Sequence, residues 1–424
     1  MVLSVEITCL IILEEARKTS MRTPGRIVIV SQHYPPDQST TAGIVTAIAA
    51  HLARTVEVLV LSGTPGSTTH QLQDIEQPTV VEIKNSLPEK TALRKRAVLE
   101  IAFAIRTFVA LLTKLHRGDV VLTVTAPFML PYAVAVAARL RGARTILILH
   151  DLYPDVLVMA GLLRPTSILT KAIRSANALM FRALNAVVII GRDTEPLLMR
   201  YRGMTREKIA FIPNWATLAP GVRPIVAENL YRGVCGSTFV VGLSGNLGFT
   251  HDPDIVFEAA QLLQNDAGIH FLLSGWGMGF ERLKARQAEA SLTNVTFVDR
   301  VPEEALEALL SAADIWVIPY RTNVAGVSVP SRFYNILAMG RPVLIIAEPD
   351  AEAALTVSQN ELGWVVTPGD ADELANTIRI ASCDKDIKIK SAHAAAIAVQ
   401  FSRSLALAKY QSLAEALLEK HHGG

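Results

Sequence analysis

The chain has 424 residues, of which 50% are hydrophobic and 19% are charged, so most of it can form large cores and is not disordered. That length predicts two domains of about 200 residues each. The formal net charge is only +2, and the basic residues are scattered without an aromatic-rich motif, which argues against nucleic acid as a partner. The mean hydropathy of +0.32 is high, but charged residues interrupt every apolar run, including Val98–Leu115, so no membrane-spanning helix is predicted.

Residues 1–21 are interpreted as an extension of doubtful role. Val2–Leu13 is apolar, yet no basic segment precedes it and Glu14 and Glu15 follow it, which is a poor match to a signal peptide. The cysteines lie far apart in the sequence and predict neither a disulfide framework nor a zinc site, so we expect a cytoplasmic protein. They are Cys9, Cys235 and Cys383.

Short β-branched runs alternate with longer helical patterns along the whole chain, which is typical of βαβ units and parallel sheets. The runs are apolar on both faces, as expected for strands covered by helices. In the first half the predicted strands are Arg26–Val30, Val56–Leu61, Val80–Ile83, Val120–Val124, Thr145–Leu149 and Ala186–Ile190. In the second half they are Phe239–Leu243, His270–Leu273, Val295–Val298, Ile315–Ile318, Pro342–Ile346 and Trp364–Val366.

The first half of the chain carries a surplus of positive charge. Residues 1–215 hold 25 Lys and Arg against 16 Asp and Glu, a balance of +9, whereas the remainder holds 16 against 23, a balance of −7. This pattern favours contact with an anionic partner, although two solvated surfaces of different charge would have the same balance.

One helical segment in the basic half has the pattern of a helix that lies on a membrane surface. It begins with three basic residues and continues with a wide apolar face. A helix packed between the sheet and its neighbours would show the same pattern. The basic residues are Arg94, Lys95 and Arg96, and the apolar face is Phe103, Ile105, Phe108, Val109, Leu111 and Leu112.

The loop Pro213–Pro224, rich in proline, glycine and small residues, predicts the boundary between the two halves. We therefore expect an α/β protein with two doubly wound domains, at 22–215 and 225–400. A final helix within residues 401–424 is expected to cross back onto the first domain. Ligands of such sheets bind beyond the carboxyl ends of the strands, so a nucleotide and an acceptor are expected between the facing domains.

Two predicted strands of the second half run into glycine-rich loops, Ser244–Gly248 and Ser274–Gly279. Glycines let a ligand approach the backbone, and the following helix N-termini favour anions, although a tight turn explains the first loop equally well. The second has the spacing G-x-G-x-G, a weak match to a nicotinamide dinucleotide site. Asp252 and Asp254 are better explained by helix capping than by a metal. The residues here that are candidates for contact with a bound nucleotide donor are Gly245, Asn246, Gly248, Gly275 and Gly277.

The most informative stretch runs from Pro330 to Val343 and reads P-S-R-F-Y-N-I-L-A-M-G-R-P-V. Ser331 is expected to cap a helix that ends at Gly340. A diphosphate would take the free N–H groups at the start of this helix and pair with the Arg332 guanidinium. The candidates for donor contact in and before this stretch are Arg321, Gly326, Ser331, Arg332 and Asn335.

This stretch resembles the donor-binding segment of family 4 retaining glycosyltransferases, which have the GT-B fold. It is most similar to the branch that builds O-antigens, capsules and exopolysaccharides such as colanic acid. Other segments resemble the same branch in the same order, and together they cover about residues 22–400. These are S-Q-H-Y-P-P-D from Ser31 with Gly43, H-D-L-Y-P-D from His150, I-P-N-W from Ile212 and S-G-N-L-G from Ser244.

The resemblance implies transfer of a sugar, with retention, from a UDP- or GDP-linked donor to a lipid-linked saccharide at the inner face of the plasma membrane. It implies peripheral membrane contact through the first domain, and neither a metal nor another cofactor. The leaving diphosphate accepts the acceptor's proton, and the enzyme supplies positioning and charge stabilisation. His150 and Asp151 are the catalytic candidates, with a packed or capping role as the alternative. The acceptor-side candidates are Tyr34, Pro36, Gly43 and Asp155.

The chain departs from the family pattern at two places. Most members have two glutamates eight residues apart where this chain has Val327 and Asn335, and a basic residue where it has Phe249–His251. Donor contacts would then be rebuilt, with Asn335 on a hydroxyl and Arg332 carrying more of the diphosphate charge. The departures keep two alternatives open: a sugar-nucleotide epimerase of the same fold, and a homologue that binds a nucleotide sugar without turnover.

Overall fold

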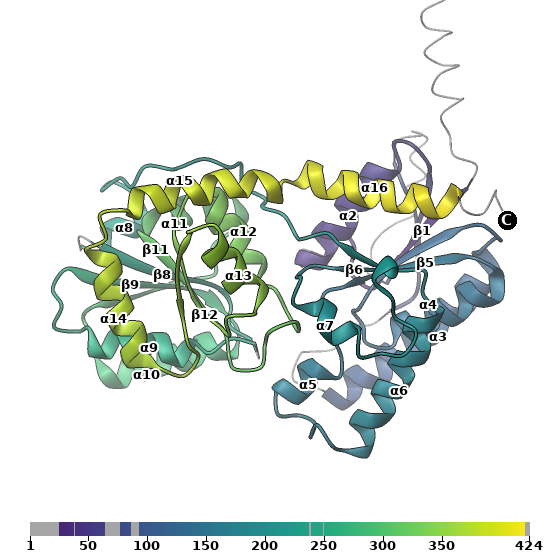
Figure 1. The fold of residues 1–424 in the computed structure, drawn as a ribbon, viewed down its shortest axis with the longest axis horizontal. Coiled ribbons are helices and arrows are strands. Elements are labelled where there is room, and N and C mark those ends of the chain that lie inside the picture. Colours follow the sequence, from purple (N-terminus) through teal and green to yellow (C-terminus); the bar gives the residue numbers. More distant parts are fainter. Residues whose placement is uncertain are drawn as a thin grey trace, which may run out of the picture.

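The computed structural model describes residues 25–37, 39–63, 77–85, 93–236, 239–248 and 250–419. They form two α/β domains that lie side by side, each with helices on both faces of a parallel sheet (Figure 1). This confirms the predicted fold class. The N-terminal extension lies outside the described residues.

The sheet of the first domain has seven parallel strands in the order β3-β2-β1-β4-β5-β6-β7. Its central strands are buried on both faces. Within the sheet, Ile29 of β1 pairs with Val60 of β2 on one side and with Leu122 of β4 on the other. The strands are β1 (Arg26–Ser31), β2 (Glu57–Ser62), β3 (Thr79–Glu82), β4 (Val120–Val124), β5 (Arg144–Leu149), β6 (Ala186–Ile189) and β7 (Ile209–Phe211).

Serine caps and glycine stops set the ends of several helices in this domain. Ser39 accepts a hydrogen bond from the Ala42 N–H at the start of α2, Ser167 does the same for Thr170 in α6, and α4 ends at Gly142, whose φ is 67°. The helices are α2 (Thr40–Leu52), α3 (Leu93–Lys114), α4 (Leu130–Arg141), α5 (Asp155–Met159), α6 (Ile168–Ala183), α7 (Thr194–Leu198) and the 3-10 turn η1 (Arg206–Lys208).

The second sheet has six parallel strands in the order β10-β9-β8-β11-β12-β13. Its strands are β8 (Phe239–Asn246), β9 (Ile269–Trp276), β10 (Val295–Asp299), β11 (Ile315–Pro319), β12 (Val343–Ile346) and β13 (Gly363–Val366). The surrounding helices are α8 (Leu230–Gly233), α9 (Pro253–Leu262), α10 (Met278–Ala290), η2 (Glu303–Ala305), α11 (Leu306–Ala312), α12 (Ser331–Ala338), α13 (Glu352–Gln359), α14 (Ala371–Ser382) and α15 (Ile387–Ala398).

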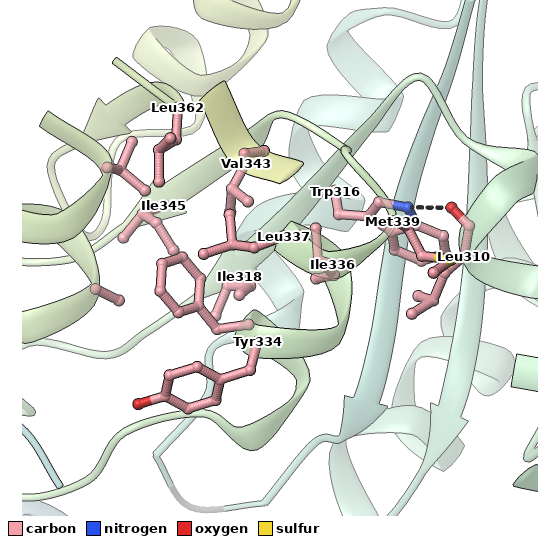
Figure 2. Close-up of a cluster of buried hydrophobic side chains, with 14 of the residues drawn as sticks. Leu310, Trp316, Ile318, Tyr334, Ile336, Leu337, Met339, Val343, Ile345 and Leu362 are labelled. Carbon is pink, nitrogen blue, oxygen red and sulfur yellow. Dashed lines mark hydrogen bonds between the residues drawn. The ribbon is translucent and has the colours of Figure 1, made fainter. Parts of the chain in front are cut away.

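A large apolar cluster holds α12 against this second sheet. Figure 2 shows Tyr334, Ile336 and Leu337 of the helix packed beside sheet residues such as Ile318 and Val343. Trp316 is fully buried, and its Nε1 donates to the Leu310 carbonyl at 3.0 Å. A Cβ atom at position 242 would lie 2.5 Å from the Trp316 ring, so Gly242 makes room for the indole. The helix that carries the predicted donor residues is therefore firmly positioned.

The C-terminal segment crosses from the second domain to the first, as predicted. After α15 and the turn η3 (Val399–Phe401), α16 (Arg403–Glu419) packs beside α2 and closes one face of the first sheet (Figure 1). Leu407, Tyr410 and Leu417 enter the same apolar cluster as Ile29. Within the described residues, no helix is both long and apolar enough to span a bilayer.

Candidate active site between the two sheets

The carboxyl ends of the two sheets meet through a polar contact that we call the interdomain clamp, formed by Arg192, Asp193, Gly326 and Glu352. The Arg192 guanidinium donates to the Glu352 carboxylate at 3.0 Å, and the Arg192 N–H donates to it at 2.6 Å. Asp193 Oδ2 accepts from the Gly326 N–H at 2.8 Å and from the Glu352 N–H at 2.9 Å. The clamp joins the loop after β6 to the predicted donor loop after β11.

His150 and Asp151 lie where β5 ends, and both donate backbone N–H bonds to Thr125 Oγ1 at 3.3 Å. His150 Nε2 is buried and finds no hydrogen-bond partner within the part of the chain that the structure describes. Burial lowers the pKa of His150 to about 4 and raises the pKa of Asp151 to about 6. At neutral pH the imidazole is therefore uncharged.

The acceptor-side candidates fall into different environments. Tyr34 is buried in the apolar cluster beneath α2, and burial raises its pKa to about 12, so its ring serves packing. Pro36 is exposed, and Gly43 lies on α2 with open space where a Cβ would be. Asp155 begins α5 and accepts a hydrogen bond from Arg174 at 2.9 Å.

The two glycine-rich segments partly continue the strands instead of being loops throughout. Gly245 pairs with Gly275, and Asn246 pairs with Trp276, in the β8–β9 register. A Cβ at position 275 would lie 2.3 Å from the Gly245 carbonyl oxygen, and one at position 277 would lie 2.7 Å from Asn246 Oδ1. Close strand approach thus accounts for Gly275, and a φ of 100° at the start of α10 favours glycine at position 277. A Cβ at position 248 would meet only the Asn246 side chain, at 3.9 Å, and ligand contact there remains a prediction.

Arg332 lies in the first turn of α12, beside a second arginine that the sequence interpretation had missed. Burial and the nearby Arg300 lower the pKa of Arg332 to about 10. The Arg300 guanidinium stacks over the Trp276 ring, 4.7 Å from its centre. Neither guanidinium forms an ion pair with any residue that the structure describes, although Glu303 is close enough to favour the charge of Arg332. The arginine pair is therefore suited to an anionic ligand.

Two of the predicted donor residues have structural partners that the sequence did not indicate. Asn335 Oδ1 accepts from the Thr217 N–H at 2.8 Å and from the Leu218 N–H at 3.2 Å, so it fixes the linker between the domains. Arg321 Nε donates to the His251 carbonyl at 3.0 Å and joins two loops at this edge of the sheet. An Asn335 contact with a donor hydroxyl would have to use the amide nitrogen.

The prediction that Ser331 caps α12 is wrong. Pro330 occupies the N-cap position, and Ser331 is the exposed first residue of the helix. Proline has no side-chain oxygen that could accept from the first helical N–H groups, so no side-chain cap bond forms. The Phe333 N–H donates to the Pro330 carbonyl at 3.2 Å, which leaves the Ser331 and Arg332 N–H groups to a ligand.

The D-x-D pair after β8 is engaged by arginines. Asp252 occupies the N-cap position of α9 as predicted, but its side chain makes no cap bond. Asp254 receives Arg282 and, at 2.9 Å, Arg286. In the described ranges, no three side chains of the metal-binding types lie close enough together to hold an ion. The carboxylate of Asp254 is thus accounted for by its two guanidinium partners.

Comparison with known proteins assigns both halves of the chain. Residues 41–215 match the family described as glycosyl transferase 4-like domain, and residues 238–384 match glycosyl transferases group 1. The chain is a GT-B glycosyltransferase of this family. The transferase is 26% identical over 408 residues to the probable glycosyltransferase WbjE of Pseudomonas aeruginosa, with 93% of this chain and 99% of that protein covered.

A second curated relative and two solved structures agree with this assignment. The putative colanic acid biosynthesis glycosyl transferase WcaI of Escherichia coli (strain K12) is 26% identical over 273 residues, with 63% of this chain and 67% of that protein covered. Anabaena Alr3699/HepE in complex with UDP superposes with a TM-score of 0.67 at 17% identity, over 92% of the transferase and 99% of HepE. A glycosyltransferase from Rickettsia africae gives 0.63 at 15%, over 93% and 98%. The two structural likenesses confirm the fold.

The transferase contains functional candidates that the sequence interpretation missed. Arg192, Asp193 and Glu352 come together only because β6 and α13 meet across the domain boundary. Arg300 follows a correctly predicted strand, and Trp276 lay inside a recognised glycine-rich segment. A cation and an aromatic residue at the carboxyl ends of neighbouring strands were therefore the available signal for the Arg300–Trp276 pair.

Proposed function

We propose that the transferase moves a sugar, with retention, from a UDP- or GDP-linked donor to a lipid-linked saccharide in the synthesis of a bacterial surface polysaccharide. The name of WcaI, which refers to colanic acid biosynthesis, supports the class of product. Structures of HepE with UDP and with UDP-glucose support the class of donor. The names of WbjE and WcaI, which both describe a glycosyltransferase, support transfer rather than epimerisation.

The arginine pair, Arg300 and Arg332, is the observation on which this proposal mainly rests. The two guanidinium groups repel each other, and this repulsion adds to burial, which is the main cause of the lowered pKa of Arg332. A donor diphosphate between them would remove that repulsion and would also receive the uncapped N–H groups at the start of α12. The same positive groups would stabilise the charge that develops on the leaving diphosphate.

The proposed reaction needs no protein nucleophile. The bond between the anomeric carbon and the diphosphate oxygen breaks, the acceptor oxygen forms the new bond on the same face, and its proton passes to the leaving diphosphate. His150, uncharged at neutral pH, would hydrogen-bond the donor sugar through Nε2. We expect no metal, because arginine side chains would supply the charge stabilisation that a cation supplies elsewhere.

We further propose that the first domain docks on the inner membrane face through the outer side of α3, α4 and α6. These helices pack against one another and hold five, two and three basic residues, respectively, against one acidic residue, Glu100. An apolar surface with surrounding positive charge is what an anionic bilayer attracts. The exposed apolar residues are Val98, Ile101, Ile105, Val109, Val136, Leu140, Ile168, Leu169 and Leu179.

The structure corrects which side of α3 would meet lipid. Phe103 and Leu111 are fully buried against the sheet, and Phe108 and Leu112 pack partly into the same cluster. Ile105 is 59% exposed. The helix is thus packed on one side and has exposed apolar residues on the other, and it is this exposed side that we propose to meet lipid.

The donor class is tested by incubating the purified chain with vesicles that carry lipid-linked saccharides and a panel of UDP- and GDP-sugars. We expect release of a nucleoside diphosphate from one donor only when the acceptor lipid is present, and NMR of the product should show the donor's anomeric configuration. An altered sugar with an intact diphosphate would support an epimerase instead. Donor binding without turnover on any acceptor would support a non-catalytic homologue, and an inverted product would refute retention.

A further inference from the structure

A groove of about 440 Å³ opens on the first domain between α5, α6 and the segment after α7. Three arginines and one carboxylate surround it, together with a tyrosine and small or apolar residues. Its lining residues are Asp155, Arg174, Ser175, Ala178, Leu197, Arg200, Tyr201 and Arg202. Neither the proposed donor site nor the interdomain clamp uses these arginines.

The groove has an excess of positive charge. Asp155 neutralises Arg174, with 2.9 Å between the two charged groups. Arg200 and Arg202 are exposed, and neither guanidinium is hydrogen-bonded or ion-paired to any residue in the described ranges. The nearby Glu195 is already paired with Arg206 at 2.8 Å. Two uncompensated guanidinium groups therefore face one groove, which is an arrangement that binds phosphate oxygens in bidentate fashion.

The position of the groove connects the donor loop with the proposed membrane face. Leu197 lines the groove and also packs against the donor loop, since a Cβ at position 326 would lie 2.6 Å from Leu197 Cδ1. On the other side the groove borders α6, where Ala178 lines it and the next residue, Leu179, is exposed. A ligand in the groove would thus lie between the reacting sugar and the bilayer.

We propose that this groove binds the phosphate or diphosphate group that joins the acceptor saccharide to its lipid. The inference rests on the proposed function, because it takes the acceptor to be lipid-linked. The lipid chain would leave along the exposed apolar side of α6, and the saccharide would extend toward His150 and the donor loop. The anionic group would thereby fix the distance between the membrane and the acceptor hydroxyl.

The test uses farnesyl diphosphate, below its micellar concentration, as a short lipid diphosphate, titrated into the full chain by calorimetry with UDP present in excess to occupy the donor site. The Arg200→Gln/Arg202→Gln variant removes the two free charges, and Arg54→Gln/Arg403→Gln removes two exposed arginines elsewhere. We expect the groove variant to bind about tenfold more weakly or worse, because charge-assisted bonds to phosphate are lost. The control variant should bind like the wild type, and farnesol should not bind.

Each other outcome overturns the proposal. Equal binding by the groove and control variants would show that general charge, not the groove, attracts the diphosphate. Binding that is seen only when UDP is left out of the titration would place farnesyl diphosphate in the donor site. If the groove variant binds farnesol and farnesyl diphosphate more weakly than the wild type by the same factor, only the apolar chain is recognised.

Turnover assays separate this inference from the proposed function. If the groove variant transfers sugar with an unchanged KM for the lipid acceptor, the groove assignment fails and the transferase function stands. If the wild type binds farnesyl diphosphate through the groove but releases no nucleotide from any donor, the proposed function fails and the groove stands. Unchanged affinity for UDP in the groove variant verifies that its donor site is intact.

Discussion

Replacing Arg192 by alanine is expected to destabilise the folded chain by about 2 kcal/mol. The change removes the guanidinium from the interdomain clamp but leaves the backbone N–H that also donates to Glu352. The Glu352 side chain is only 6% exposed, so it would become a buried carboxylate without its cationic partner.

The magnitude follows from the exposure of the two partners. A carboxylate that loses a fully buried partner destabilises a protein by about 3–5 kcal/mol. Arg192 is 44% exposed, so water already screens part of the attraction. Glu352 also keeps two acceptor contacts, with the Arg192 N–H and with the Thr356 hydroxyl at 3.1 Å. These two effects reduce the expected loss to about half of the fully buried value.

Urea unfolding of the wild type and of two variants measures this loss. Arg206→Ala is the matched control, because Arg206 also pairs with a carboxylate, at 2.8 Å, but is 81% exposed. It should lose less than about 1 kcal/mol. R192A should in addition weaken UDP binding, since the clamp holds the Gly326 loop through Asp193. Equal unfolding midpoints for R192A and R206A would refute the reasoning that burial makes the clamp strong.

Four further predictions concern the site and the membrane face. R332A should weaken UDP binding by about 2 kcal/mol in calorimetry, because the diphosphate loses a charge-assisted partner; unchanged affinity would remove Arg332 from the site. EDTA should leave turnover intact, and activity restored only by magnesium or manganese would contradict this. Burial raises the pKa of Asp151 to about 6, above its usual value of 3.8, so this group favours folding at low pH and opposes it as the pH rises through about 4 to 6. Asp151→Asn should therefore raise the free energy of unfolding at pH 8 but not at pH 4. An equal effect of the variant at both pH values would argue against the pKa shift. Ile105→Ser/Val109→Ser should abolish flotation with anionic vesicles and leave the unfolding midpoint unchanged. Phe103→Ser should lower that midpoint, because Phe103 is fully buried. Flotation retained by the double variant would exclude the exposed side of α3 as the membrane-binding face.

The strands were predictable because their signal is local. Every predicted strand begins within one residue of an observed strand, and Val120–Val124 coincides with β4. Covered parallel strands are short runs of β-branched residues, and the sequence displays such runs directly. β7 was missed because Ile209–Phe211 has only three residues and no pattern of its own. Its pairing with Val187 supplies what the sequence lacks.

The site was less predictable because its contacts join distant parts of the chain. Asn335 binds the linker at Thr217, which is 118 residues away in sequence. Glu352 meets Arg192 across 160 residues. Helix periodicity identified an apolar segment at α3, but such a helix is apolar on nearly all sides, and only packing decides that Phe103 faces inward.

The crossing of α16 onto the first domain imposes an order on biosynthesis. A ribosome finishes residues 22–215 long before it reaches Leu407, Tyr410 and Leu417, which complete the apolar face shared with Ile29. Domains of most multidomain proteins fold as units during synthesis, the N-terminal one first. Here the nascent first domain must keep that face uncovered until the second domain has been translated. A chaperone that shields apolar surface would have its longest period of contact at this apolar face beside α2, and a nonsense mutation shortly after residue 400 would leave the chain in that unfinished state.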